Sequence, residues 1–187
     1  MINQIAPKVW KLNVDSNIYF LDFKEKTIID AGPKQYRQIV EQELSKIINP
    51  DKITKVIFTH LHYDHIGNFD LFKNAKFYTS EEEITILKKN KLYTIGDPLL
   101  AAHFKVTLNP LKDTKELKII KTPGHTKGSI CIYYEKEKVL FSGDTLFQNG
   151  FGRTDFPFSD PGKMEESLES LQKIGYKTLA PGHDYWK

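Results

Sequence analysis

Short apolar runs rich in β-branched residues alternate along this chain with stretches in which apolar residues recur at helical spacing. The first pattern is typical of strands, which we expect at residues 8–12, 17–23, 27–30, 53–58, 76–79, 116–121, 129–134, 138–142 and 178–180. The second pattern predicts helices over residues 36–48, 80–89 and 161–174. Because helices recur between sheet segments, we expect an α/β protein with strands inside and helices outside.

The segment 92–110 has the weakest pattern. Gly96, Asp97, Pro98 and Pro110 interrupt a short apolar stretch. Glycine and proline are the strongest local breaks of regular structure. We therefore expect a loop with one helical turn here, flanking a substrate cleft.

Residues 59–65, with the sequence THLHYDH, follow an expected strand and hold three of the six histidines. In an extended segment residues i and i+2 face the same side, so His60 and His62 can direct two imidazoles at one point. Asp64 shares this phase if the chain stays extended. His65 is out of phase, so we expect the chain to bend there and a short helix to begin directly after it. Imidazole and carboxylate groups are ligands of zinc, iron or manganese.

Three more candidate ligands each follow an expected strand, where a loop can reach over the end of a sheet. A glycine directly precedes His125, Asp144 and His183 and lets the backbone approach closely. His103, the sixth histidine, lies in the irregular segment, and we expect no role for it in the site. Each turn alone has an ordinary structural explanation, but together they complete two sets of metal ligands. The expected ligands are His60, His62, Asp64, His65, His125, Asp144 and His183.

These motifs resemble those of the metallo-β-lactamase superfamily, and within it the glyoxalase II-like hydrolases. The matching segments are THLHYDHIGN at 59–68, TPGH at 122–125, SGDTLF at 142–147, PGH at 181–183, DAG at 30–32 and GRTDF at 152–156. The resemblance implies a four-layer αββα sandwich, formed as one domain over residues 1–187, with the metal site at one edge of the two sheets. It divides the ligands into His60, His62 and His125 for one cation, Asp64, His65 and His183 for a second, and Asp144 between them.

Three features narrow the chemistry that the resemblance implies. The commonest true β-lactamases of this fold have cysteine at the position of Asp144. Cys131 cannot replace it, because it lies within an expected strand, where we predict a small buried core residue. The di-iron flavoprotein relatives have glutamate at the position of His62. The chain ends four residues after His183, whereas glyoxalase II proper continues into a helical domain that helps to bind glutathione. From these three features together we expect neither β-lactam hydrolysis nor strict glutathione specificity.

We therefore expect a metal-dependent hydrolase of small thioesters or esters, a hydroxyacyl-thioester hydrolase similar to glyoxalase II. Two divalent cations roughly 3.5–4 Å apart can share a water, lower its pKa towards ~7 and so supply hydroxide for attack on a carbonyl. A thiolate leaves readily and needs no strong general acid. Asp64 is the candidate catalytic residue, because it can orient the attacking water. The expected cofactor is two divalent metal ions, zinc first, with iron or manganese as alternatives.

Several residues outside the ligand set are further candidates. Asp30 is a candidate partner for a ligand histidine, with a simple turn aspartate as the alternative. Arg153 could bind an anionic group, and we accordingly expect an anionic thioester as substrate. The alternative, which we favour slightly for Arg153, is an ion pair with Asp155 within the loop. We expect Tyr185 and Trp186 to pack the C-terminus rather than stack on a ligand.

Two other activities of the same fold stay open. A mononuclear iron persulfide dioxygenase would use His60, His125 and Asp144, and the 152–156 motif favours it. A phosphodiesterase or nuclease would suit two cations, but the net charge of +3 and the dispersed basic residues argue against a nucleic-acid partner. No signal peptide or membrane-length apolar run is visible, so we expect a cytoplasmic protein without a membrane partner. The sequence does not determine the oligomeric state.

Overall fold

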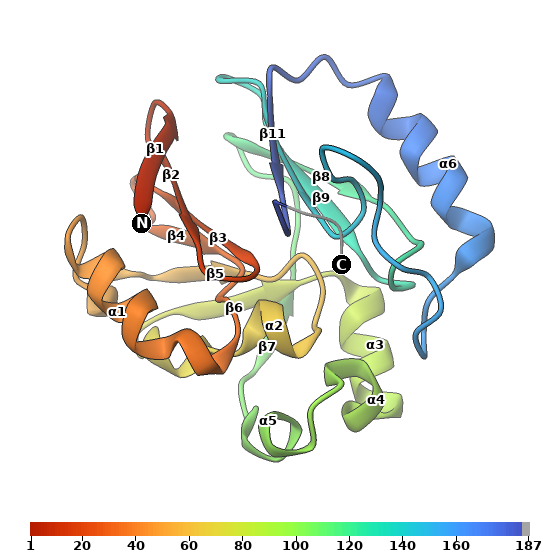
Figure 1. Ribbon diagram of the computed structural model, residues 1–187, viewed down its shortest axis with the longest axis horizontal. Coiled ribbons are helices and arrows are strands. Elements are labelled where there is room, and N and C mark those ends of the chain that lie inside the picture. Colours follow the sequence, from red (N-terminus) through yellow and green to blue (C-terminus); the bar gives the residue numbers. More distant parts are fainter. Residues whose placement is uncertain (185–187) are drawn as a thin grey trace.

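The computed structural model describes residues 1–184, which form two β-sheets packed face to face (Figure 1). Tyr185 and Trp186, expected to pack the C-terminus, lie outside the described residues. The first sheet has seven strands in chain order: β1 (Ile2–Ala6), β2 (Val9–Asn13), β3 (Asn17–Leu21), β4 (Thr27–Ile29), β5 (Lys55–Ile57), β6 (Lys76–Thr79) and β7 (Leu108–Pro110). Strands β1 to β4 pair antiparallel, and β4 to β7 pair parallel.

The second sheet has four strands in the order β11–β10–β9–β8. Their bounds are β8 (Leu117–Lys121), β9 (Ile130–Tyr134), β10 (Val139–Gly143) and β11 (Thr178–Pro181). Strand β9 runs antiparallel to both β8 and β10, and β11 runs parallel to β10. Strands β8, β10 and β11 therefore all end at the same edge of this sheet.

Helices cover the outer faces of both sheets (Figure 1). They are α1 (Arg37–Ser45), α2 (Tyr63–Ile66), α3 (Glu81–Lys89), α4 (Lys91–Ile95), α5 (Pro98–His103) and α6 (Pro161–Gln172), with 3₁₀ turns at Lys34–Tyr36, Pro50–Lys52 and Phe69–Leu71. None of the described helices is long and apolar enough to cross a bilayer.

The core is divided into layers by the alternation of side chains along the strands. In β3, Ile18 and Phe20 join the cluster that includes Leu44 of α1, while Tyr19 and Leu21 join the cluster between the sheets. A third cluster lies beneath α6 and contains Cys131, confirmed as a buried core residue. Apolar side chains on both faces of the strands thus account for the expected αββα sandwich, which the structure confirms.

The segment 92–110 is more regular than its sequence predicts. It contains most of α4, all of α5 and the edge strand β7, where we expected a loop with one helical turn. The side chain of Asn90 accepts a hydrogen bond from the Tyr93 amide at 3.1 Å, and that of Asp97 accepts one from the Leu100 amide at 2.7 Å. These caps start two helices that are too short to show helical periodicity.

Candidate metal centre

The expected ligands lie at one edge of the sandwich, in the segments that follow the ends of strands. His60 and His62 follow β5 of the first sheet, whereas His125, Asp144 and His183 follow β8, β10 and β11 of the second. Because these three strands of the second sheet run in the same direction, their carboxyl ends meet at this edge. Segments far apart in the sequence thereby meet at one place.

The bend after β5 occurs earlier than we expected. His62 is extended, with φ −68° and ψ 150°, and the helix α2 begins directly after it at Tyr63. The amide of His65 donates a hydrogen bond to the carbonyl of His62 at 2.9 Å. The prediction that the chain bends at His65 and turns helical only after it is therefore wrong, because the helical turn already begins at Tyr63. Asp64 and His65 instead lie on α2.

The structure brings all seven expected ligands together. Their candidate ligand atoms form groups, within each of which all atoms lie within 4.8 Å of one another: His60, His62 and His125; Asp64, His65 and His183; and His60, His65 and Asp144. Asp144 lies among them, with Oδ1 3.2 Å from Nε2 of His65 and Oδ2 3.6 Å from Nε2 of both His125 and His183. This is the arrangement that two cations with a shared carboxylate would need.

Unsatisfied buried atoms show that this cluster fits divalent cations. Nε2 of His60 is buried without a hydrogen-bond partner among the described residues. Nε2 of His65 and Oδ1 of Asp144 also make no well-aligned hydrogen bond there, although they lie 3.2 Å from each other. A buried polar atom without a partner is destabilising by roughly 1–3 kcal/mol, and native proteins hold few of them. Poorly satisfied buried atoms gathered in one cluster therefore indicate a group that binds there. The chemistry of the donors, imidazole and carboxylate, suits zinc, iron or manganese.

The protonation of the three imidazoles of the first proposed ligand set agrees with this assignment. Burial, together with neighbouring imidazoles, holds the pKa of His60 well below its usual range and lowers the pKa of His62 to about 3. Burial also lowers the pKa of His125. Rings of this kind are neutral at pH 7, which is the form that binds a metal.

The ring nitrogens that face away from the cluster are anchored by the protein. Nδ1 of His65 lies 2.9 Å from Oδ2 of Asp30, and Nδ1 of His125 lies 2.7 Å from the carbonyl oxygen of Arg153. Nδ1 of His183 lies 2.9 Å from the carbonyl oxygen of Asp15. Such contacts fix the ring orientation and leave Nε2 directed into the cluster. Asp30 thus makes the contact to a ligand histidine that we expected, and it also accepts hydrogen bonds from the amide and hydroxyl of Thr59, both at 2.8 Å.

At two positions in the candidate metal centre, neighbouring atoms lie so close to the backbone that only glycine fits. A Cβ on Gly182 would lie 2.1 Å from Oδ1 of Asp144, far inside contact distance. Gly143 has φ +50°, and a Cβ there would lie 2.6 Å from Oγ1 of Thr59. The glycines that precede the candidate ligands therefore provide space that no side chain could share.

Glu83 contributes to this region, although the sequence pattern did not indicate it as a site residue. The residue is fully buried in the first turn of α3. Its Oε2 accepts a hydrogen bond from the amide of Leu61 at 3.0 Å, and its Oε1 accepts one from the hydroxyl of Thr126. Leu61 lies between His60 and His62, and Thr126 follows His125, so one carboxylate joins both loops of the first ligand set. Burial raises the pKa of Glu83 to about 7, against the effect of these hydrogen bonds.

The sequence around Glu83 indicates a helix cap rather than a contact with the loops of the candidate metal centre. Ser80 and Glu83 match the capping-box spacing, and Ser80 Oγ indeed accepts a hydrogen bond from the Glu83 amide at 3.0 Å. In a complete box the glutamate side chain would turn back to the cap residue. Here it turns to the two loops, which only the tertiary fold brings near.

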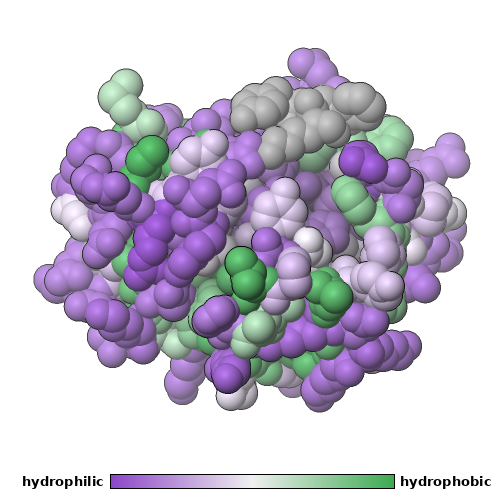
Figure 2. Space-filling view, turned by 60° about the horizontal axis from the view of Figure 1, so that its bottom comes forward, coloured by the Kyte–Doolittle hydropathy of each residue, from purple (hydrophilic) through white to green (hydrophobic). Residues whose placement is uncertain are grey.

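A cavity of about 630 Å³ opens beside the ligand cluster. Its lining residues are His62, Tyr63, Asp64, Leu92, Tyr93, Ile95, Gly96, Pro98, His125, Asp144, Phe147, Gly152, Arg153, Phe156, Pro157 and His183. Figure 2 shows the face that carries α4 and α5, where hydrophobic side chains gather near the centre of a mostly hydrophilic surface. The candidate metal centre therefore has an adjacent space for a substrate.

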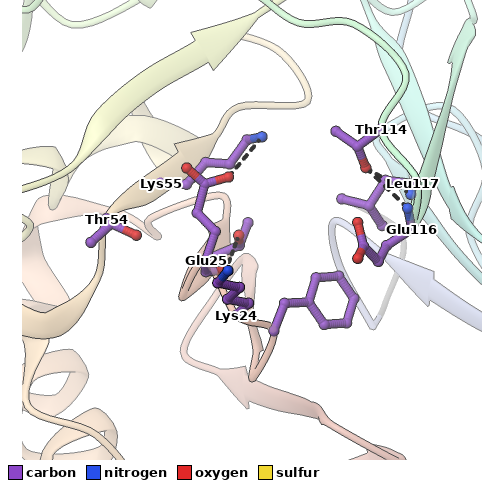
Figure 3. Close-up of a pocket in the computed structure, with 9 residues that line it drawn as sticks. Lys24, Glu25, Thr54, Lys55, Thr114, Glu116 and Leu117 are labelled. Carbon is purple, nitrogen blue, oxygen red and sulfur yellow. Dashed lines mark hydrogen bonds and ion pairs between the residues drawn. The ribbon is translucent and has the colours of Figure 1, made fainter.

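A second cavity, of about 390 Å³, lies at the opposite edge of the sheets, where β4, β5 and β8 begin (Figure 3). Its charged residues include Lys55 and Glu25, whose side chains pair at 3.3 Å. None of the expected ligands lines this cavity. We assign it no part in the chemistry.

Sequence comparison agrees with the fold and the ligand cluster. The family model described as the metallo-beta-lactamase superfamily matches residues 13–90 and 111–183, which include all seven expected ligands. The chain belongs to the metallo-beta-lactamase superfamily.

Individual relatives place the chain among the metallo-hydrolases of this superfamily. A protein of Methanocaldococcus jannaschii named "Probable metallo-hydrolase" is 34% identical, and the match covers 94% of this chain and 92% of that protein. A hydroxyacylglutathione hydrolase of Francisella philomiragia is 28% identical over 96% of this chain and 68% of its own length. Among solved structures, a metallo-beta-lactamase family protein from Thermus thermophilus superposes with a TM-score of 0.76 at 22% identity, covering 95% of this chain and 73% of that one. That structural likeness shows the fold alone.

Proposed function

We propose that this chain hydrolyses small thioesters or esters, as a hydroxyacyl-thioester hydrolase similar to glyoxalase II, and that residues 1–187 act as one domain. The observation that carries the proposal is the convergence of two complete ligand sets around Asp144 beside a substrate-sized cavity. The similarity to hydroxyacylglutathione hydrolases supports the thioester as the bond that is cleaved.

We propose two divalent cations as cofactors, zinc first, with iron or manganese as alternatives. The proposed ligands are His60, His62 and His125 for one cation, Asp64, His65 and His183 for the other, and Asp144 for both. When bound, such cations supply a water that is activated at neutral pH and polarise the carbonyl of the substrate.

Asp64 is the proposed catalytic residue. Its Oδ2 lies 3.3 Å from Nε2 of His183, and its side chain lines the cavity. Although burial favours the neutral acid, the charge of His65 and the contact with His183 hold the pKa of Asp64 at about 2. Asp64 is therefore ionised at pH 7 and can accept a hydrogen bond from an attacking water and orient it.

The cavity also indicates the kind of leaving group. Among the described residues that line it, every imidazole and carboxylate belongs to the proposed ligand set. No separate carboxylic acid or imidazole is therefore at hand to protonate a leaving group. A thiolate needs no such proton, whereas an amide nitrogen does, which supports thioesters over amides.

The two alternative activities explain fewer of the observed features of the site than thioester hydrolysis does. A persulfide dioxygenase with one iron would use His60, His125 and Asp144 and would leave Asp64, His65 and His183 without a cation. A nuclease or phosphodiesterase would need a basic path to the centre, and Arg153 is the only lysine or arginine among the described lining residues. We therefore propose a small-molecule substrate.

The test is thiol release by purified protein loaded with zinc, iron or manganese. S-lactoyl thioesters of glutathione and of N-acetylcysteamine should release free thiol, and the most active form should hold two metal ions per chain. His62→Gln should lower kcat/KM by about 100-fold or more, because a ligand is lost. His103→Gln, in the exposed histidine of α5, is the matched control and should retain activity. No thiol release from any metal-loaded form would overturn the proposal.

A further inference from the structure

We propose that the cavity beside the metal centre selects thioesters with an apolar, uncharged acyl group. This inference depends on the proposed thioester hydrolysis and adds the chemical class of the substrate. It differs from the anionic substrate that the sequence suggested, and the walls of the cavity are the reason.

Two apolar walls enclose the space next to the ligands. The first wall comes from α4 and the start of α5 and includes Leu92, Tyr93 and Pro98. The second comes from the long connection between β10 and α6 and includes Phe147 and Phe156. A group that is attached to a carbonyl at the metal centre would enter the space between these walls.

The exposure of these side chains points to a ligand. Leu92 is 47% exposed, Tyr93 57% and Phe156 36%, although each lies within a chain that buries most of its large apolar residues. Single exposed apolar residues are normal, but a cluster that surrounds a polar centre is typical of a binding groove. The cavity volume of about 630 Å³ lies in the range of small-molecule sites.

The charge of Arg153 is already matched within its own loop. Its Nε lies 3.0 Å from Oδ1 of Asp155, and its Nη2 lies 2.8 Å from Oδ2. The guanidinium carbon also lies 4.5 Å from the centre of the Phe156 ring. The described lining therefore offers an anionic acyl group no unpaired cation apart from the metal centre, while it offers an apolar group several contacts.

The experiment compares acyl groups on one thiol. Acetyl, butanoyl, hexanoyl and succinyl thioesters of N-acetylcysteamine are supplied to the metal-loaded full chain, and kcat/KM is measured for each. We expect kcat/KM to rise by up to about fourfold for each buried methylene. Butanoyl and succinyl have equal length and differ by a terminal carboxylate, and we expect butanoyl to be preferred by about tenfold or more. Equal rates for all acyl groups, or preference for succinyl, would overturn the inference and leave thioester hydrolysis standing.

Two leucine variants distinguish the effect of a charge in the first wall of the cavity from the effect of a charge on the protein surface. Leu92→Asp places a charge in the first wall and should lower kcat/KM for the hexanoyl thioester at least about five times more than for the acetyl thioester. Leu99→Asp is the matched control, because Leu99 is 74% exposed on α5 and does not line the cavity. An equal loss in both variants would count against the assignment of this wall.

A binding measurement keeps the inference independent of turnover. Acetate, butanoate, hexanoate and succinate are titrated into the metal-loaded protein by calorimetry. Affinity that rises with chain length, and that is lost in Leu92→Asp, would support the apolar site. It would do so even if no thioester were hydrolysed. In that case only the proposed function would be overturned. Affinity that is independent of chain length would overturn the inference.

Discussion

The carboxylate of Glu83 accepts a hydrogen bond from the backbone amide of Leu61 at 3.0 Å, and so holds the peptide between His60 and His62. The other oxygen of the same carboxylate accepts the hydroxyl of Thr126, next to His125. All three histidines of the first ligand set are thus positioned by one buried side chain that itself contributes no ligand atom.

Loss of this carboxylate should weaken the proposed metal site of His60, His62 and His125. In Glu83→Ala the Leu61 amide and the Thr126 hydroxyl lose their hydrogen-bond partner inside the protein. We therefore expect the free energy of unfolding to fall by about 2–4 kcal/mol. We also expect the affinity for one of the two proposed metal ions to fall by about tenfold or more. Chemical denaturation and competition with a chelator measure the two effects. Glu82→Gln is the matched control, because Glu82 pairs with Lys121 at the surface, where an ion pair contributes at most about 1 kcal/mol. Equal effects in both variants would contradict the role of Glu83.

The raised pKa of Glu83 predicts a pH-dependent difference in stability. In the unfolded chain the glutamate titrates near 4.5, whereas burial raises the pKa in the folded chain to about 7. Between these values the folded chain binds more protons, so this group's contribution to stability is complete below pH 4.5 and is lost as the pH rises through 7. The stability of the metal-free wild type relative to Glu83→Gln should therefore fall by about 2–3 kcal/mol across this window. A difference that is flat or rises from pH 4.5 to 7 would show that the carboxylate is stabilised when ionised.

Asp30 should affect the second proposed metal site, which includes His65, more than the first. Its Oδ2 contacts Nδ1 of His65 at 2.9 Å, so Asp30→Asn keeps the shape but removes the charge that orients the ring. We expect a loss of about 10–100-fold in affinity for one of the two cations, measured by metal analysis after graded chelation. Asparagine also tolerates the left-handed backbone, with φ +56°, at this position. Asp22→Asn, in an exposed turn, should leave both sites intact.

Gly182 is expected to tolerate no side chain. In Gly182→Ala the new Cβ would lie 2.1 Å from Oδ1 of Asp144, so either the carboxylate or the His183 loop must move. We expect bound metal to fall below one ion per chain and thiol release to fall by about 100-fold or more. Gly175→Ala is the control, because a Cβ there meets no atom within 4 Å. Normal metal content in Gly182→Ala would contradict the close packing at Asp144.

The clustering of the proposed ligands could be predicted because each of them depends on local sequence. His125, Asp144 and His183 each combine a preceding strand with a glycine turn, and the structure brings them together with the THLHYDH ligands. The start of α2 was missed because a helix of four residues shows no periodicity, so the hydrogen bond from His65 to His62 left no signal. Short capped helices in 92–110 were missed for the same reason.

The residues that support the ligands were harder to predict. The bonds of Glu83 to Leu61 and Thr126 join positions 22 and 43 residues apart, and no local pattern records such a contact. The Ser80 cap already provided a sufficient local explanation for that glutamate. By contrast, Arg153 and Asp155 are two residues apart, and the ion pair that we favoured for them is present.

The two sheets contribute ligands to each set, and neither sheet carries a complete one. His60 and His62 depend on His125 from the opposite sheet, just as Asp64 and His65 depend on His183. Neither half of the sandwich alone carries a complete proposed ligand set, so we expect tight metal uptake to follow the docking of the two halves. Once captured, the ions would cross-link those halves, so a cell that starves this protein of metal would lower its resistance to unfolding as well as its catalysis.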